Sequence, residues 1–264
     1  MKPKPEGPNY GNYESPDKPA GWLARLLPSL AFYSRVTKIV LWSSNRARKG
    51  NYSDSDWVFA SQSIQDTFEK AGCHVSIKGT EHIAGLDGPA VIIGNHMSTA
   101  ETFLLPSILA PFRMITYVVK QSLMEYPIFK HIMRSRNPIV VGRTNPREDL
   151  KAVIGGGQER LKNGLSVIIF PQKTRSVVFD RESFNTIGVK LAKRAGVPVI
   201  PLALKTNAWS NGKLLKDYGR FRPEEKVMIE FGPPIRVESN DREVHQAVGD
   251  FIEERLRKWG VPIA

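Results

Sequence analysis

A histidine and a glutamate five residues apart follow a short apolar segment. Residues 90–94 read AVIIG and lead into NHMSTAE, in which His96 and Glu101 are the side chains able to hold or transfer a proton. If 89–95 is a buried strand of a parallel sheet, His96 lies at the edge where α/β proteins place their ligand sites. A carboxylate one helical turn further on can keep Nδ1 of the imidazole protonated and leave Nε2 free as a general base.

The common motifs of other enzyme classes are absent from the sequence. There is no Gly-x-Ser-x-Gly elbow, P-loop or Gly-x-Gly-x-x-Gly turn, and no Cys/His cluster at metal spacing. With no nucleophile beside His96, the atom to be deprotonated should belong to the substrate, most simply a hydroxyl. A structural alternative stays open, because Ser98-x-x-Glu101 is also a capping box that would begin a helix at 99 without catalysis.

Four cations stand just past the ends of other predicted strands. They are Lys120 after MITYVV, Arg143 after IVVG, and Lys173 with Arg175 in FPQKTR. In a parallel sheet these strand ends converge on the edge that carries His96. A base beside fixed cations suits a phosphorylated alcohol, since the cations would hold the phosphate while the base takes the hydroxyl proton.

The elements that must position these residues alternate between strands and helices. We predict strands at 74–83, 89–95, 113–120, 139–143, 166–171, 197–204 and 226–232, and helices at 99–110, 146–162, 185–196 and 245–259. Gly155, Gly156 and Gly157 interrupt one of these helices for no reason evident in the sequence. The alternation is typical of an α/β fold with a mostly parallel sheet flanked by helices in three layers, which we expect over residues 73–264.

The first 72 residues have a different pattern. Residues 1–20 hold five of the 19 prolines and almost no aliphatic side chains, so we predict a disordered tail. Over 21–72 we predict an amphipathic helix pair, at 22–42 and 54–70. This appendage packs on the main domain, or lies in a membrane interface with basic residues on phospholipid head groups, or does both through different faces. No segment has about 18 uninterrupted apolar residues, so no transmembrane helix is expected.

Charge and cysteine content narrow the partners and the compartment. The chain of 264 residues has 38 Lys and Arg against 26 Asp and Glu, a net charge of +12. This excess favours an anionic partner. Phenylalanines and tyrosines do not alternate with basic residues as in a base-stacking platform, so nucleic acid is not expected. Cys73 is alone and favours a reducing compartment. We expect a peripheral or monotopic protein on the anionic cytoplasmic face of the cell membrane.

Four blocks over residues 89–205 resemble the lysophosphatidic acid acyltransferases and their glycerolipid acyltransferase relatives. GNHMSTAE is similar to the family's Asn-His-x-x-x-x-Asp block, and VVGR to its second block. FPQKTRS is similar to the third block, Phe-Pro-Glu-Gly-Thr-Arg-Ser, and VPVIPLAL to the fourth. The N-terminal helix pair also resembles the monotopic membrane anchor of bacterial members.

The resemblance implies transfer of an acyl chain from acyl-coenzyme A or acyl carrier protein to the free hydroxyl of lysophosphatidic acid, giving phosphatidic acid. His96 would be the base, oriented by Glu101. No metal or bound cofactor is implied, because a thioester is already activated. The residues implied to bind substrate are Asn95, Lys120, Arg143, Gln172, Lys173, Thr174 and Arg175.

The sequence departs from the family pattern at two places. Glu101 replaces an aspartate and is one methylene longer. Gln172 and Lys173 replace Glu and Gly, which removes a negative charge and adds a positive one, a change that favours an anionic acceptor head group. Two alternatives therefore stay open: an acyltransferase for another lysolipid, and a catalytically inactive homologue that binds membranes.

Overall fold

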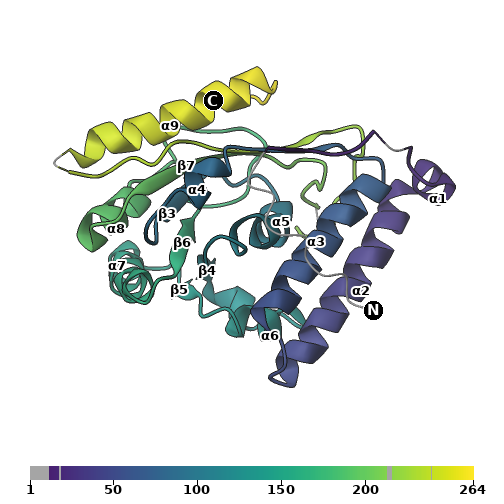
Figure 1. The fold of residues 1–264 in the computed structure, drawn as a ribbon, viewed down its shortest axis with the longest axis horizontal. Helices are drawn as coiled ribbons and strands as arrows, with labels where there is room; N and C mark the ends of the chain where they lie inside the picture. The colour runs from purple at the N-terminus through teal and green to yellow at the C-terminus, as the bar shows by residue number, and fades with distance from the viewer. Residues whose placement is uncertain (1–11, 18, 213–215, 239) are drawn as a thin grey trace.

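One mixed sheet with helices on both faces organises the part of the chain that the structure describes. The computed structural model describes residues 12–264 except 18, 213–215 and 239. Within these residues the strand order is β1-β2-β8-β7-β3-β6-β4-β5 (Figure 1). Strands β7, β3, β6, β4 and β5 pair in parallel, whereas β8 is antiparallel to β7 and β1 to β2. This is the fold that the sequence predicts, a mostly parallel sheet flanked by helices in three layers.

The bounds of the elements follow the apolar segments closely. The strands are β1 (Tyr13–Glu14), β2 (Val75–Lys78), β3 (Val91–Gly94), β4 (Ile115–Lys120), β5 (Ile139–Val141), β6 (Ser166–Ile169), β7 (Val199–Lys205) and β8 (Val227–Phe231). The helices are α1 (Trp22–Leu26), α2 (Pro28–Arg48), α3 (Asp54–Lys70), α4 (Glu81–Ala84), α5 (Ala100–Leu109), η1 (Gln121–Met124), α6 (Phe129–Arg134), α7 (Pro146–Lys162), α8 (Ile187–Ala195) and α9 (Asp241–Lys258).

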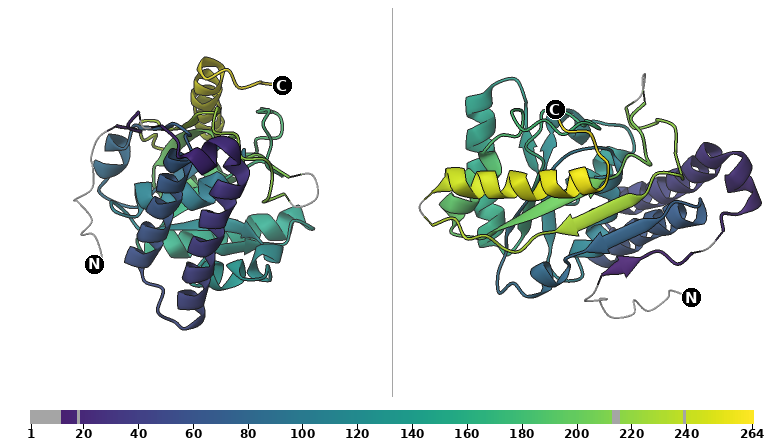
Figure 2. Two further views of the ribbon diagram at one scale, coloured as in Figure 1. Left: turned by 90° about the vertical axis from the view of Figure 1, so that its right-hand side faces the viewer. Right: turned by 90° about the horizontal axis from the view of Figure 1, so that it is seen from above.

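The sheet separates two apolar cores. Helices α2, α3, α5 and α6 cover one face, and α7, α8 and α9 cover the other (Figures 1 and 2). Successive residues of β3 alternate between them: Ile92 packs in the first core, and Val91 and Ile93 pack in the second. A strand buried on both faces needs apolar residues throughout, which is why these strands read as continuous apolar segments.

The N-terminal helices form a hairpin that packs on the first core. Figure 1 shows α2 and α3 side by side along one end of the molecule. A capping box between Ser53 and Asp56 begins α3, and Arg46 near the end of α2 donates to Asp56 at 2.9 and 3.1 Å. Phe32 of α2 is fully buried and stacks on Phe221 at 4.0 Å between ring centroids. The hairpin therefore belongs to the fold of the main domain.

Three local predictions differ from the structure. The segment 74–83 is a strand only over β2, because Gly79 adopts a φ of +78° and leads into α4. The first predicted helix divides at Pro28, the first residue of α2. Within the predicted disordered tail, Tyr13–Glu14 form β1 on β2, while residues 1–11 and 18 lie outside the described residues.

The glycine triplet finds a partial explanation in helix packing. Helix α7 runs through it without a break. A Cβ on Gly157 would lie 2.5 Å from a terminal carbon of Leu191, so the glycine allows α7 and α8 to approach closely. Gly155 faces open space, and nothing in the structure explains it.

Candidate active site

A histidine–carboxylate pair lies at the carboxyl end of β3. His96 follows the last strand residue by two positions, and its Nδ1 lies 2.5 Å from Oε2 of Glu101 in the first turn of α5. The His96 side chain is 17% exposed and that of Glu101 is fully buried. Because Glu101 occupies Nδ1, Nε2 is the ring nitrogen that does not face this carboxylate.

The buried Glu101 carboxylate is held by further donors. Its Oε1 accepts the backbone N–H groups of Met97 and Ser98 at 2.8 and 2.7 Å and the hydroxyl of Thr206 at 2.6 Å. These bonds offset the cost of burying the carboxylate and fix its orientation. Only half of the capping box forms, since Ser98 Oγ accepts from Ala100 rather than from Glu101. Glu101 therefore caps the helix and contacts the imidazole at the same time.

The segment after β6 supports the histidine from its other side. Gln172 is buried, and its Oε1 accepts the backbone N–H of His96 at 2.6 Å. The ring of Phe170 stacks on the imidazole, 4.6 Å away and only 6° from parallel. Ser176 N–H donates to the carbonyl of His96 at 2.9 Å. An amide oxygen serves at position 172 as a carboxylate oxygen would, so the loss of charge there leaves the support of His96 intact.

Arg175 lies beside the pair but has a carboxylate partner. Its Nη1 donates to Oδ1 of Asp217 at 2.8 Å and also to the hydroxyl of Thr99, which itself donates to Asp217 at 2.9 Å. The Arg175 side chain is 16% exposed. The ion pair fixes the guanidinium next to the first turn of α5. Among the described residues, both side-chain hydrogen bonds of this guanidinium come from Nη1.

Of the other predicted cations, Arg143 bonds to the loop after β6, whereas Lys120 and Lys173 have no such role in the described contacts. Arg143 adopts a left-handed φ of +61°, and its Nη1 donates to the carbonyl of Lys173. Its own backbone N–H is held by Asp149 at 2.9 Å. Lys173 and Lys120 have exposed side chains. Thr174 is exposed too, and its hydroxyl accepts from Lys216 at 3.4 Å. Arg143 thus braces the loop that carries Lys173.

Asn95 is buried between β3 and β7. Its Oδ1 accepts the N–H of Leu204 and its Nδ2 donates to the carbonyl of Leu204, both at 2.8 Å. The side chain is 2% exposed and continues the pairing of β3 with β7. Both ends of the amide are engaged with the backbone of Leu204, so the Asn95 side chain links β3 to β7 directly before His96.

Sheet order explains which predicted residues come together. From β3 the order runs through β6 and β4 to β5, so the loops with His96, Gln172 to Arg175, Lys120 and Arg143 stand in that sequence along one edge. At about 4.8 Å per strand, Lys120 starts roughly 10 Å to the side of His96. A long lysine side chain can cover much of that gap. The edge therefore presents the imidazole of His96 and several cations to one region of solvent.

Three contacts were missed by the sequence analysis. Thr206 and Asp217 belong to the segment after β7, and they reach the site because β7 pairs with β3. Neither lies in a recognisable motif. Phe170 lies in a segment that the sequence singled out, but its stacking on His96 depends on the pairing of β6 with β3.

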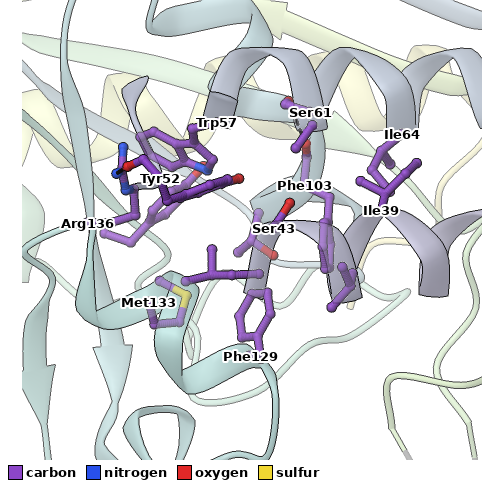
Figure 3. A pocket seen from close by; sticks show the side chains of 15 residues that line it. Ile39, Ser43, Tyr52, Trp57, Ser61, Ile64, Phe103, Phe129, Met133 and Arg136 are labelled. Atoms are coloured by element: carbon purple, nitrogen blue, oxygen red, sulfur yellow. Dashed lines mark hydrogen bonds between the residues drawn. The ribbon is translucent and has the colours of Figure 1, made fainter. Parts of the chain in front are cut away.

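A small apolar cavity lies behind α5, between the N-terminal hairpin and the sheet (Figure 3). It is lined mainly by aromatic and aliphatic side chains, among them Tyr52, Trp57, Phe103 and Phe129. Its volume of about 40 Å³ is well below the roughly 150 Å³ that accepts benzene in an engineered protein core. The cavity is too small for an acyl chain in this conformation.

The described residues contain neither a metal-binding cluster nor a membrane-spanning helix. Within them, no cluster of three His, Cys, Asp or Glu side chains could bind a metal ion. In the same part of the chain, no helix combines the length and apolar character needed to cross a bilayer.

The chain is similar in sequence to known acyltransferases. The model of the family described as Acyltransferase matches residues 74–205. The 1-acyl-sn-glycerol-3-phosphate acyltransferase of Pseudomonas aeruginosa is 32% identical over 189 residues, which are 72% of this chain and 68% of that protein. The enzyme of the same name from Cocos nucifera is 23% identical, over 85% of this chain and 68% of its own.

A solved structure has the same architecture. The crystal structure of the 1-acyl-sn-glycerophosphate acyltransferase from Thermotoga maritima superposes with a TM-score of 0.66 at 23% identity, covering 88% of this chain and 95% of that one. The likeness shows the shared fold. With the match over residues 74–205 and the relative at 32% identity, the predicted family is confirmed: the chain belongs to the acyltransferase family and is an O-acyltransferase.

Proposed function

We propose that the protein transfers an acyl chain from a thioester to the free hydroxyl of lysophosphatidic acid, giving phosphatidic acid. The observation that carries the proposal is the oriented His96, with Glu101 on Nδ1 and Nε2 left at an edge lined by cations. The names of the relatives from Pseudomonas aeruginosa and Cocos nucifera support the choice of acceptor. The thioester donor is acyl-coenzyme A or acyl carrier protein.

The proposed reaction uses His96 as a general base. Nε2 takes the proton of the acceptor hydroxyl as the oxygen attacks the thioester carbonyl. The tetrahedral intermediate then collapses, the carbon–sulfur bond breaks, and the imidazolium returns the proton to the leaving thiolate. Base catalysis of this kind supplies about 10²- to 10⁴-fold. The proposal needs no metal or bound cofactor, because the thioester carbonyl is already reactive.

The cations are proposed to hold the acceptor phosphate. Arg175 offers its remaining nitrogens beside His96, and the exposed Lys120 and Lys173 add positive charge along the same edge. Arg143 acts indirectly, through the carbonyl of Lys173. A phosphate gripped at this edge would bring a hydroxyl of the same small molecule to Nε2.

The N-terminal end is proposed to dock on an anionic membrane surface. Trp22 and Leu26 of α1 are 75% and 72% exposed, and Leu27 and Leu30 beside them are also exposed. Large apolar side chains grouped at one end of a molecule mark an interaction site. Basic residues nearby, such as Arg25, would meet phospholipid head groups. We propose peripheral binding at the cytoplasmic face.

Retention by vesicles tests the membrane proposal. The variant Trp22→Ser/Leu26→Ser should lose most of its binding to vesicles that contain phosphatidylglycerol. Removal of the whole hairpin would be uninformative, since Phe32 and Phe68 belong to the core. Leu150→Ser, which also removes an exposed leucine but from α7, is the control. Undiminished retention of the double variant would rule out this docking end.

An acceptor panel tests the proposed substrate. Purified protein with a long-chain acyl thioester should form phosphatidic acid from lysophosphatidic acid, detected by mass. Product from a different lysolipid alone would correct the acceptor and keep the reaction. No product from any acceptor, in folded protein bound to vesicles, would favour an inactive membrane-binding homologue.

A further inference from the structure

A basic groove lies between α7 and α8, on the face of the sheet opposite the N-terminal hairpin. Its volume is about 500 Å³. It is lined by Arg147, Leu150, Lys151, Ile154, Lys190, Lys193, Arg194 and Asp241. Five of these residues are cations and one is a carboxylate, so the basic groove is one of the places where the net charge of +12 is concentrated.

Two features of the sequence build this groove. Residues 147, 150, 151 and 154 recur at helical spacing, so they share one face of α7. Gly157 lets α7 pack tightly on Leu191 of α8, and Gln158 bonds to the carbonyl of Arg194 at 3.1 Å. The two helices therefore present one continuous surface. Lys193 pairs with Asp241 at 3.3 Å at the far side.

One end of the groove adjoins the edge that carries the active site. Arg147 is the second residue of α7, which begins just after the loop with Arg143. That loop follows β5, and β5 is three strands away from β3. The lateral distance to His96 is therefore roughly 15 Å. A molecule bound in the groove needs a flexible arm to bring a thioester to His96.

We propose that the basic groove binds an acidic, amphipathic helix of the carrier protein that delivers the acyl thioester. The inference rests on the proposed function and adds a site for its donor. Acidic side chains of the helix would meet the rim of lysines and arginines, and an apolar side chain would lie on Leu150 and Ile154. From 147 to 154 α7 rises about 10 Å, which matches about two turns of a bound helix.

The lining suits a protein helix better than the nucleotide of coenzyme A. None of the lining residues carries an aromatic ring on which an adenine could stack. The cations are spread along two helices, with Arg147 and Lys151 on α7 and Lys190, Lys193 and Arg194 on α8. Leu150 is 38% exposed and Ile154 is partly exposed, which gives the groove the apolar strip that an amphipathic helix requires.

Charge reversal in the full-length chain tests this docking surface. The variant Lys151→Glu/Lys190→Glu changes two exposed residues of the groove, neither of them in the candidate active site. Lys162→Glu/Lys258→Glu makes the same change of net charge at exposed positions outside it. Each variant is assayed with acyl carrier protein and with coenzyme A carrying the same acyl chain, and binding of unacylated carrier protein is measured by fluorescence anisotropy.

The groove variant should lose about tenfold or more in kcat/KM with the carrier-protein donor, mainly through KM, because like charges now oppose the docking helix. Its kcat/KM with the coenzyme A donor should stay within about twofold. Carrier-protein binding should weaken in the groove variant, keep its affinity in the control, and fall with added salt in the wild type.

Equal losses with both donors, or equal losses in the control variant, would overturn the docking site. So would wild-type protein that fails to bind the carrier protein or to use its thioester while using that of coenzyme A. If neither donor gives product, the proposed function fails, and the anisotropy measurement still decides whether the groove binds an acidic carrier.

Discussion

Replacing Glu101 by glutamine should nearly abolish acyl transfer while leaving the fold intact. Oε1 of Glu101 receives three donors, from Met97, Ser98 and Thr206, so the amide oxygen of a glutamine must take that position. The amide NH₂ then faces Nδ1 of His96, 2.5 Å from the present oxygen. A donor at this place requires Nδ1 to accept, which moves the ring proton to Nε2.

The expected loss follows from the tautomer. An imidazole protonated on Nε2 cannot take a proton from the acceptor hydroxyl, so the whole contribution of the base is lost. We expect kcat to fall about 10²- to 10⁴-fold, with KM for the acceptor changed less than about threefold. Steady-state kinetics with lysophosphatidic acid measure both constants, and thermal unfolding checks the fold.

Glu101→Asp is the matched control, since it keeps the charge and restores the residue typical of the family. It should retain far more activity than the glutamine variant, because a carboxylate can still accept the Nδ1 proton. A glutamine variant with kcat within about threefold of wild type would refute the reasoning. In that case the orientation of the imidazole by Glu101 would have no role in the reaction.

Three further predictions concern the support of the site and the stability of the chain. Gln172→Ala should lower kcat about tenfold, because it removes the oxygen that accepts the backbone N–H of His96. Gln172→Glu keeps such an oxygen and should retain most of the wild-type kcat. Steady-state kinetics that give the two variants equal losses of kcat would contradict the role of the acceptor oxygen. Gly157→Ala should lower the free energy of unfolding by about 1–3 kcal/mol, because the added methyl group would overpack against Leu191. Gly155→Ala, where the methyl group meets open space, should raise the free energy of unfolding by about 0.5–1 kcal/mol. Denaturant titrations in which both variants change the free energy of unfolding in the same direction would contradict this packing of α7. Burial raises the pKa of the Cys73 thiol from 9.0 to about 12, so folding favours the protonated thiol. Its contribution is complete below pH 9.0 and falls by about 1.4 kcal/mol per pH unit as the pH rises above that value. Cys73→Ala should flatten the decline between pH 9 and 10 in urea titrations, and an unchanged slope would argue against the buried thiol.

The fold could be predicted where burial alone determines the pattern. The strands β3, β6 and β7 are covered on both faces, so their sequences are apolar without interruption and stand out. The predicted strand at 74–83 was too long, because apolar residues continue past the end of β2. Its end depends on Gly79, where a Cβ would lie 2.0 Å from the carbonyl oxygen of Phe231. That contact comes from a strand about 150 residues later, so no local pattern reveals it.

The site divides in the same way. His96 and Glu101 are close in sequence, and a helix start brings them together, so their pairing could be predicted from spacing. Asp217 and Thr206 reach the site only through the pairing of β7 with β3. The hydrogen bonds of Asn95 also depend on that pairing, since an asparagine beside His96 looks the same in sequence whether its amide faces a ligand or a strand.

The most direct test of the account compares wild-type protein with His96→Ala in acyl transfer to lysophosphatidic acid. Both proteins are supplied with the same long-chain thioester and anionic vesicles, and phosphatidic acid is followed by mass. We expect steady product formation by the wild type and a loss of at least about 10²-fold in the variant, with unfolding temperature and vesicle binding preserved. Product formed at a similar rate by the His96→Ala protein would contradict the central claim that this imidazole is the base.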